Sequence, residues 1–556
     1  MSLKSQSRRP LSFYWFVLFA LVFLIQVGPR LKMDSSVADE MVEITDGYYY
    51  WSGDVISDSA HPPLPKALQA LPLRWMGLQS KGKGIFTDYQ RRAFNFLFVL
   101  NRDRFESAYA AARFVSLLFG LGIGGLLFLT ARKGRLSFLL PVMLLWSLEP
   151  NLLAFSGVVM ADIVLAFFYL LAVYSFQKLL ERRGESKGSF LTGILAGMAI
   201  ASKFSGVLLI PVFLIMELLQ GLKEEPQKIR QILLPMGLRW GWGLAGSFCF
   251  IGLLYLPGTL KLPDHLSPFD YFLDGFKTMA GFSGHPTYFM GQLSIKTHLS
   301  YFPTLFLIKS PLTFLFFGGL SVFLSLSGKI KIPAWHWIPA LILFAAIAPV
   351  QNVGVREILP AYPFFILMAA AGVSWLWNQS SRGIKPIFKV LVGALFLFQA
   401  ASLALAFPRH ISYFNEMIPP ERKIYWLGDS NLDMGQDTKR FALFARQKGW
   451  GKVKLAYFGT ADPEFYGMKW DYWTQKDLEG PQPGQVYAVN AEFLQLGPAF
   501  LPGVRAITEG WISRIPPSGK LGDTWYYFEM PGEAVQDDSP RFFSTMPFKT
   551  YERLND

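Results

Sequence analysis

Apolar residues gather along the chain in runs of about 20, the length that crosses the hydrocarbon core of a bilayer as a helix. Short polar gaps separate the runs. The runs cover residues 11–27, 108–130, 137–155, 158–177, 190–202, 204–220, 233–256, 302–327, 334–350, 358–376 and 386–407. The pattern predicts a polytopic α-helical membrane protein with about eleven transmembrane helices.

The two runs that flank Lys203 are short for full spans, and the sequence between them reads Ser-Lys-Phe-Ser-Gly. Non-helical backbone at membrane depth is tolerated where it is buried in protein or lines a cavity. The segment around Lys203 is therefore expected to form a broken or re-entrant pair of helices.

Basic residues mark alternate gaps between the runs, among them Arg132 and Arg135, Arg182 and Lys187, and Lys329 and Lys331. Cytoplasmic loops carry such an excess of Lys and Arg. With residues 11–27 as an uncleaved anchor and the N-terminus in the cytoplasm, the loop 30–104, the segment 257–300 and everything after residue 408 face outward. The only Asn-x-Ser, at Asn378, then falls on the cytoplasmic side, which favours a bacterial inner membrane.

The net charge of +13 comes from 53 Lys and Arg against 40 Asp and Glu. Because the basic residues follow the orientation rule, they do not indicate nucleic acid as a partner. The single cysteine, Cys249, lies in an apolar run, so an intrachain disulfide and a site built on several thiolates are excluded.

Residues 409–556 change in character, since their apolar runs are too short to span and alternate with Gly, Pro and charges. We expect a small outward α/β domain there, after a transmembrane domain of residues 1–408. Strands are predicted at 424–427, 453–457, 486–489 and 525–529, and a helix at 437–447. In the first outward loop, Leu64, Leu68, Leu71 and Trp75 share one face of a helix that is expected to lie on the membrane surface.

The first outward loop also carries groups suited to catalysis. Asp39 and Glu40 are neighbours, so they point in different directions and only one of them is expected to act in a given pocket. Asp162 opens an apolar run near the same membrane face, where an ionisable residue is usually functional. Tyr49, the middle of three consecutive tyrosines, and His61, ahead of two prolines, are expected to contact substrate, as is His285 in a second His-Pro pair.

Four cations are predicted at or near the outer face, against the orientation rule: Lys66, Lys203, Lys309 and Arg356. An anionic ligand such as a phosphate at the membrane surface explains cations in this place. A serine hydrolase site at Gly428-Asp429-Ser430 is excluded, because no nucleophile elbow is present and no histidine follows His410. No glycine-rich nucleotide-binding signature is found either.

Together these motifs resemble the GT-C superfamily of membrane glycosyltransferases, and specifically the protein O-mannosyltransferase and aminoarabinose transferase group, which uses polyprenyl-phosphate sugars. The resemblance covers about residues 1–408. It rests on Asp39-Glu40, the tyrosines, His61-Pro62-Pro63-Leu64 with Lys66, Asp162 in Val-Met-Ala-Asp-Ile, Lys203 in Ala-Ser-Lys-Phe-Ser-Gly, and Arg356 in Val-Arg-Glu-Ile-Leu-Pro. The tail is similar to that of uncharacterised bacterial members, and it names no substrate.

The resemblance implies a role for each matching position. Asp39 is the general base that takes the proton from the acceptor hydroxyl, which attacks the anomeric carbon with inversion. Lys66, Lys203 and Arg356 bind the lipid phosphate, and Lys309 is expected to join them. Asp162 orients the acceptor or, with Asp39, holds a divalent metal ion. The expected partners are a polyprenyl-phosphate sugar, an acceptor protein, lipid or glycan, and membrane lipids.

Two other classes of protein fit a polytopic chain. A transporter or lipid flippase predicts inverted repeats and charged pairs along a path at the midplane, whereas here the ionisable candidates gather at one face. A membrane-anchored sensor leaves Asp162 and Lys203 unexplained. An Asp39→Asn substitution separates an enzyme from both alternatives, because only the enzyme depends on this carboxylate for turnover.

Overall fold

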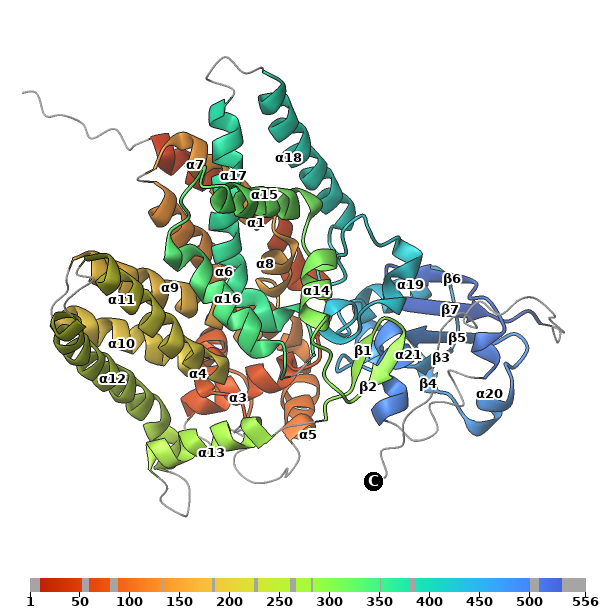
Figure 1. The fold of residues 1–556 in the computed structure, drawn as a ribbon. Coiled ribbons are helices and arrows are strands. Elements are labelled where there is room, and N and C mark those ends of the chain that lie inside the picture. Colours follow the sequence, from red (N-terminus) through yellow and green to blue (C-terminus); the bar gives the residue numbers. More distant parts are fainter. Residues whose placement is uncertain are drawn as a thin grey trace, which may run out of the picture.

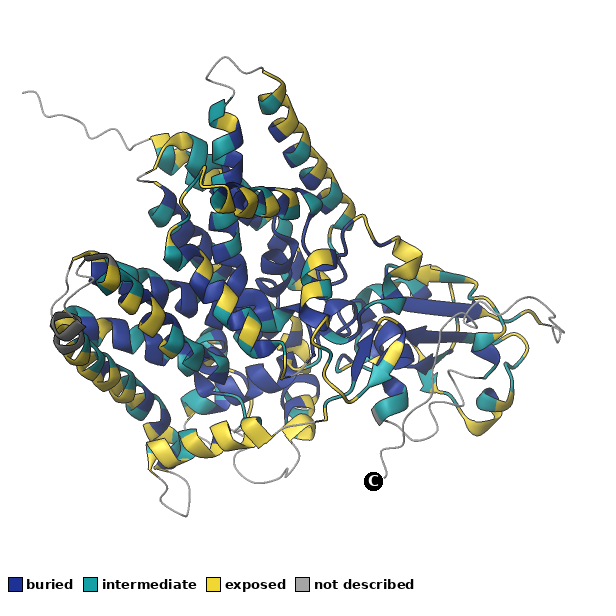
Figure 2. Ribbon diagram, in the orientation of Figure 1, coloured by how far each residue is buried: buried dark blue, intermediate teal, exposed yellow. Residues whose placement is uncertain are grey.

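The computed structural model describes residues 11–52, 60–80, 89–132, 134–182, 186–224, 229–260, 267–281, 284–350, 352–379, 386–500 and 510–532. A body of packed helices forms the first three quarters of the chain, and a smaller domain with a β-sheet lies beside it (Figure 1). The helical body is buried along its centre, while α13 and one side of α18 are exposed (Figure 2).

The predicted apolar runs are largely helical, but 137–155 is broken at Leu148 and Glu149, and 302–327 is broken at Ser310 and Pro311. The helices of the body are α1 (Leu11–Val27), α2 (Arg30–Met33), α3 (Glu40–Ser52), α4 (Pro63–Gln69), α5 (Tyr89–Phe94), α6 (Phe105–Ala131), α7 (Leu136–Ser147), α8 (Pro150–Phe155), α9 (Ala161–Glu181), α10 (Ser186–Ile200), α11 (Leu209–Glu224), α12 (Ile229–Thr259), α13 (Pro268–Gly281), α14 (Tyr301–Lys309), α15 (Leu312–Leu326), α16 (Ala334–Ile347), α17 (Tyr362–Gln379) and α18 (Ile387–Ala406). Short 3-10 helices, Leu71–Trp75, Phe204–Leu208 and η5 (Val355–Ala361), join some of them. Seven of the described helices are long and apolar enough to cross a membrane, and a bent pair makes an eighth candidate. The chain is therefore an integral membrane protein.

The bent pair is α14 and α15, whose axes differ by 118°. The break at Ser310 and Pro311 leaves carbonyl groups of α14 without helical partners, and Asn415 compensates. Its side chain donates to the carbonyls of Leu307 (2.6 Å) and Ser310 (2.8 Å), and its backbone N–H donates to Ile308 (2.9 Å). The first residues after the membrane helices thus stabilise the break.

The prediction that a helix of the first outward loop lies on the membrane surface is wrong. A helix does begin at Pro63, as the prolines indicate, but α4 is buried against α3. Gly47 on α3 permits this packing, because a Cβ there would lie 2.0 Å from the carbonyl oxygen of Lys66. Tertiary packing overrides the amphipathic pattern, and of the four predicted residues only Trp75 is largely exposed.

The C-terminal domain is built on a mixed five-stranded sheet in the order β4-β3-β5-β7-β6. Its elements are α19 (Thr438–Gln447), β3 (Val453–Ala456), β4 (Trp470–Tyr472), α20 (Gln475–Glu479), β5 (Val486–Asn490), α21 (Ala491–Phe500), β6 (Gly519–Leu521) and β7 (Trp525–Glu529). Strand β3 runs parallel to β4 and β5, while β7 is antiparallel to β5 and β6. The α/β prediction is confirmed.

One predicted strand of the tail, 424–427, is wrong. Its first residues belong to a 3-10 helix, Pro420–Tyr425. The amide of Gln495 on α21 donates to the carbonyl of Ile424 (2.7 Å), and Leu427 forms an isolated bridge with Phe289 of the hairpin β1 (Thr287–Phe289) and β2 (Gln292–Ser294). The backbone of this segment is therefore hydrogen-bonded to α21 and to the hairpin, and it is not part of the sheet.

Candidate active site

Asp39 and Arg356, which are 317 residues apart in the sequence, form an ion pair at the outward side of the helical body as the topology predicts it. A guanidinium nitrogen of Arg356 lies 3.2 Å from a carboxylate oxygen of Asp39. Asp39 occupies the turn before α3, and Arg356 lies on the first turn of η5, which leads into α17. Packing of the outward loop against this helix start brings the two predicted residues together.

Lys203 and Asp162 form a second pair, 2.8 Å apart, next to the first. Lys203 has an extended backbone at the break between α10 and the 3-10 helix Phe204–Leu208, as the sequence around it predicts. Asp162 lies on the first turn of α9. Glu357, the neighbour of Arg356, also accepts from the Lys203 ammonium at 2.7 Å. The two adjacent residues of η5 thus join both ion pairs into one cluster.

The C-terminal domain adds Asp429 and Glu492 to this cluster. The carboxylate of Asp429 lies 4.0 Å from the imidazole of His285, and its backbone N–H donates to Glu492 at 3.1 Å. Burial raises the pKa of Asp429, while the charges of Arg356 and His285 oppose that shift. Burial and the nearby carboxylates of Asp429 and Asp433 raise the pKa of Glu492 as well.

Neither Glu357 nor these two tail carboxylates were predicted from the sequence. Glu357 directly follows a predicted site residue, and that adjacency is the one signal that the sequence offered. Asp429 belongs to the Gly428-Asp429-Ser430 motif, which was rejected as a hydrolase site, and to the tail segment of the family resemblance, which assigned it no role. Glu492 follows a predicted strand, β5, without any motif around it.

Several predicted site residues have other partners. Glu40 is fully buried and binds Arg113 (2.5 Å) as well as the backbone N–H groups of Val37 (3.0 Å) and Val159 (2.8 Å). The buried Lys309 ammonium donates to the carbonyls of Ile411 (2.8 Å) and Asn431 (2.7 Å). Both side chains stabilise backbone around the site.

Three further predicted residues lie on or beside α3 and α4. Lys66 is fully buried, 3.1 Å from the carboxylate of Asp46. Tyr49 is buried beneath the guanidinium of Arg92, which lies 3.9 Å from the centre of its ring. His61 is half-buried just before α4. A role in binding substrate remains a prediction for each of them.

A metal ion held by Asp39 and Asp162 does not fit the observed contacts. Each carboxylate is paired with a cation, Arg356 and Lys203 respectively. Within the residues that the structure describes, no three His, Cys, Asp or Glu side chains come together in a way that could hold a metal ion. We therefore derive no step through a metal ion.

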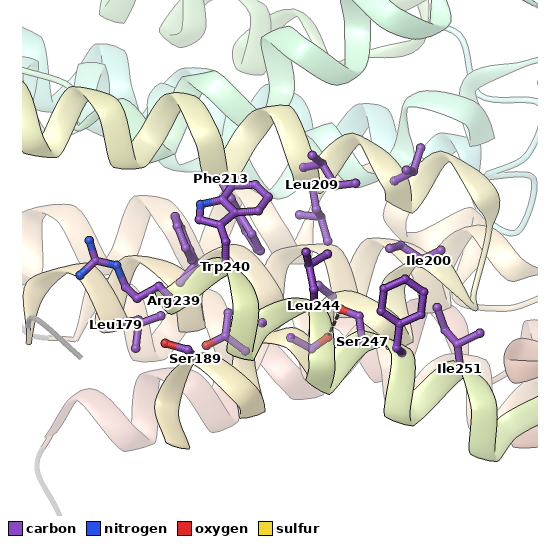
Figure 3. A pocket seen from close by; sticks show the side chains of 18 of the residues that line it. Leu179, Ser189, Ile200, Leu209, Phe213, Arg239, Trp240, Leu244, Ser247 and Ile251 are labelled. Carbon is purple, nitrogen blue, oxygen red and sulfur yellow. Dashed lines mark hydrogen bonds between the residues drawn. The ribbon is translucent and has the colours of Figure 1, made fainter. Parts of the chain in front are cut away.

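An apolar cavity of about 290 Å³ lies among α9, α10, α11, α12 and α13. Ile200 and Val207, which flank the break at Lys203, line one part of it. Figure 3 shows Ile200 and Ile251 at one end and Arg239 with Trp240 at the other. Arg239 and Trp240 both bind Glu217, at 2.6 and 2.8 Å, so this polar end is neutralised within the protein. The remaining wall suits a hydrocarbon chain.

The structure thus combines a helical membrane body with a cluster of paired carboxylates and cations. Residues 13–262 match the family described as dolichyl-phosphate-mannose-protein mannosyltransferase. The chain is thus a membrane glycosyltransferase similar to the protein O-mannosyltransferases. No protein of curated function matches the sequence significantly.

Solved structures with a similar arrangement include ArnT from Cupriavidus metallidurans in the apo state, with a TM-score of 0.48 and 13% identity, covering 93% of this chain and 98% of that one. The oligosaccharyltransferase of Archaeoglobus fulgidus in the apo form has a TM-score of 0.47 and 11% identity, covering 88% and 71%. The protein O-mannosyltransferase Pmt1-Pmt2 complex of S. cerevisiae, bound to the sugar donor, has a TM-score of 0.33 and 21% identity, covering 46% and 35%.

Proposed function

We propose that the protein transfers a sugar from a polyprenyl-phosphate donor to an acceptor hydroxyl on the extracytoplasmic side of a bacterial inner membrane, with inversion at the anomeric carbon. The acceptor is a protein, lipid or glycan. The observation that carries the proposal is the cluster of Asp39, Arg356, Glu357, Lys203 and Asp162, which lies beside an apolar cavity. A polar reaction centre next to space for a hydrocarbon chain suits a lipid-linked donor.

Asp39 is the carboxylate of the cluster best placed to act as the base. Its side chain is 56% exposed, against 4% for Asp162 and 18% for Glu357. An acceptor hydroxyl can therefore reach it. In the reaction the acceptor oxygen bonds to the anomeric carbon, its proton goes to Asp39, and the bond from that carbon to the phosphate oxygen breaks. A positioned base contributes about 100- to 10,000-fold.

Arg356 and Lys203 are the proposed phosphate ligands. The charge on the leaving phosphate grows as the glycosidic bond breaks, so preorganised cations at this point favour the transition state. In the structure both cations are paired with carboxylates, and the phosphate must compete with Asp39 for Arg356. Transfer of Arg356 to the phosphate would free Asp39 to accept the proton. The prenyl chain would extend from Lys203 past Ile200 and Val207 into the apolar cavity.

The first experiment identifies the donor and tests the base. Mass spectrometry of lipids that copurify with the protein should detect a polyprenyl-phosphate sugar. With that donor, Asp39→Asn should lower turnover by about 100-fold or more and leave donor binding within a few-fold of the unsubstituted enzyme. Asp103→Asn, at another exposed carboxylate of the first outward loop, is the matched control and should retain activity.

Two outcomes would contradict the proposal. If Asp39→Asn turns over at the unsubstituted rate, Asp39 is not the base. If the protein moves the lipid across vesicle bilayers without forming a glycosylated product, it is a flippase instead of a transferase.

A further inference from the structure

One stretch of the C-terminal domain, residues 429–436, contacts both loops that carry the proposed catalytic pair. On the side of Asp39, the backbone N–H of Ala38 donates to the carbonyl of Met434 (2.9 Å), and that of Ser35 donates to Gln436 (3.0 Å). The Ser35 hydroxyl donates to the carbonyl of Gly435 (2.6 Å). The tail therefore fixes the chain that leads into Asp39 at two points, Ser35 and Ala38.

The same stretch holds the turn that carries Arg356. The backbone N–H of Val355 donates to the side-chain oxygen of Asn431 at 2.9 Å, and Asn431 also donates to the hydroxyl of Tyr301 at 3.0 Å. Gly354 lies against the side chain of Ser430, because a Cβ at this glycine would lie 2.0 Å from the Ser430 hydroxyl oxygen. Eight residues of the tail thus set the separation between the Asp39 loop and the Arg356 turn.

Asp429 begins this stretch in a conformation that few residues adopt. Its φ is 55°, in the left-handed region that Asp and Asn tolerate best among residues with a side chain. Its carboxylate accepts from the next backbone N–H, of Ser430, at 2.5 Å, while Glu492 accepts its own N–H. Strained backbone fixed from several sides is characteristic of functional sites.

The fixed carboxylate of Asp429 interacts electrostatically with Arg356, His285 and Asp39. Arg356 accordingly has a carboxylate from the first outward loop and another from the C-terminal domain. When Arg356 releases Asp39 to bind phosphate, Asp429 still attracts the guanidinium from the C-terminal domain, together with Asp162 and Glu357 of the helical body. A side chain that must move between two anions needs such a restraint, because a misplacement of about 1 Å can cost about 100-fold in rate.

We infer that Asp429 is a positioning residue of the active site: the C-terminal domain supplies it to orient the Arg356 guanidinium toward the donor phosphate. This inference rests on the proposed function, and it gives the tail a part in donor use besides any contact with the acceptor. The proton and the glycosyl group do not pass through Asp429.

The test is a double-substitution cycle in the full-length enzyme. Asp429→Asn preserves the shape of the side chain and tolerates the left-handed backbone, so the melting temperature should stay close to the unsubstituted value. Its kcat/KM for the donor should fall about 10-fold or more. Arg356→Lys removes the forked guanidinium but keeps the charge and should also lower kcat/KM. Asp471→Asn, at an exposed carboxylate of the same domain, is the control and should be unchanged.

The decisive readout is coupling. If Asp429 acts through Arg356, Asp429→Asn should lower kcat/KM less than twofold in the Arg356→Lys background, since coupled residues are not additive. Additive losses would overturn the inference and assign Asp429 an independent role, and an unchanged kcat/KM in Asp429→Asn would overturn it too. An active Arg356→Lys enzyme with normal kcat/KM would instead refute the proposed phosphate ligand, and with it the inference.

Discussion

Lys203 and Glu357 form an ion pair of 2.7 Å across 154 residues of sequence. Asp162 accepts from the same ammonium at 2.8 Å. This lysine therefore connects the break before α11 with the turn that begins α17, and it is the only cation of the cluster that two carboxylates bind within 3 Å among the described residues.

From this arrangement we expect Glu357→Gln to tighten binding of polyprenyl phosphate by about threefold or more. A neutral amide no longer competes with the phosphate for Lys203, and partly buried charges interact more strongly than exposed ones. Lys203→Met should weaken binding about 10-fold or more. The check is a titration of the lipid phosphate against the purified protein, with the exposed Glu529→Gln as control. Weaker binding by Glu357→Gln would show that this residue assists the phosphate instead of competing with it.

Glu40→Ala is expected to unfold the first outward loop. Removal of the carboxylate leaves the buried Arg113 without its anionic partner and two backbone N–H groups without an acceptor. Breaking such a buried pair costs about 3–5 kcal/mol. The melting temperature in detergent should fall accordingly, whereas Asp39→Asn, one residue earlier and largely exposed, should leave it unchanged. A Glu40→Ala enzyme that is stable but inactive would show that Glu40 acts in catalysis and is not needed for stability.

Lys309→Met should destabilise the attachment of the C-terminal domain. The substitution leaves the carbonyls of Ile411 and Asn431 without their donor, at about 1–3 kcal/mol for each buried unsatisfied group. Limited proteolysis between the two domains should accelerate, and donor affinity of the intact fraction should be unchanged. Lys329→Met, at an exposed lysine, is the control. A loss of donor affinity at unchanged proteolysis would identify Lys309 as a phosphate ligand.

Gly47→Ala should separate α3 from α4. A Cβ at this position would lie 2.0 Å from the backbone oxygen of Lys66 and 2.6 Å from the side chain of Ala70, and neither can rotate away. Overpacking of this kind costs about 1–3 kcal/mol or more. Gly125→Ala on α6, where no atom lies within 4 Å of the added carbon, is the control and should melt as the unsubstituted protein does. Equal melting temperatures for both variants would refute the tight contact.

The stability of the protein should depend on pH through Asp433. Burial raises the pKa of Asp433 to about 7, and two backbone N–H groups that it accepts, from Gly435 (2.9 Å) and Glu492 (3.2 Å), oppose this shift only partly. The folded state therefore holds this proton more tightly than the unfolded state, whose Asp pKa is about 3.9. Its contribution to stability is complete below about pH 4 and is lost as the pH rises to about 7.

Asp433→Asn provides the reference for that measurement, because the amide does not titrate. The unfolding free energy of the unsubstituted protein minus that of Asp433→Asn should decrease steadily from pH 5 to pH 7, by up to about 1.4 kcal/mol per pH unit. A difference that stays constant over this range would show that the carboxyl group is ionised throughout.

The sequence predicted the helical body well because membrane helices are encoded locally. A helix satisfies its own backbone, so most of these elements do not depend on distant partners, whereas the break at Ser310 and Pro311 relies on Asn415. The break at Lys203 was equally local, since Lys, Ser and Gly interrupt the run there. In the tail, β3, β5, β7 and α19 follow their own periodicity, and all four are confirmed.

The composition of the site depended on long-range contacts that the sequence does not reveal. Asp39, Asp162, Lys203 and Arg356 were predicted from membrane topology and resemblance, and the structure brings them together. Membrane topology alone does not distinguish a cation that faces a ligand from one that donates to buried carbonyls. Lys309 is of the second kind. Asp429 escaped prediction because its partner, Arg356, is brought to it only when the tail folds onto the membrane helices.

The pairing of Ser35 with Gly435 and Gln436 has a consequence for biogenesis. Ser35 and Gly435 are 400 residues apart in the sequence. At roughly 5–20 residues per second of synthesis, the two segments can therefore come into contact only about 20–80 s after Ser35 is made. During that interval the proposed reaction centre lacks its contacts with the tail. A nascent or prematurely terminated chain that lacks the tail is thus expected to be inactive in the proposed transfer.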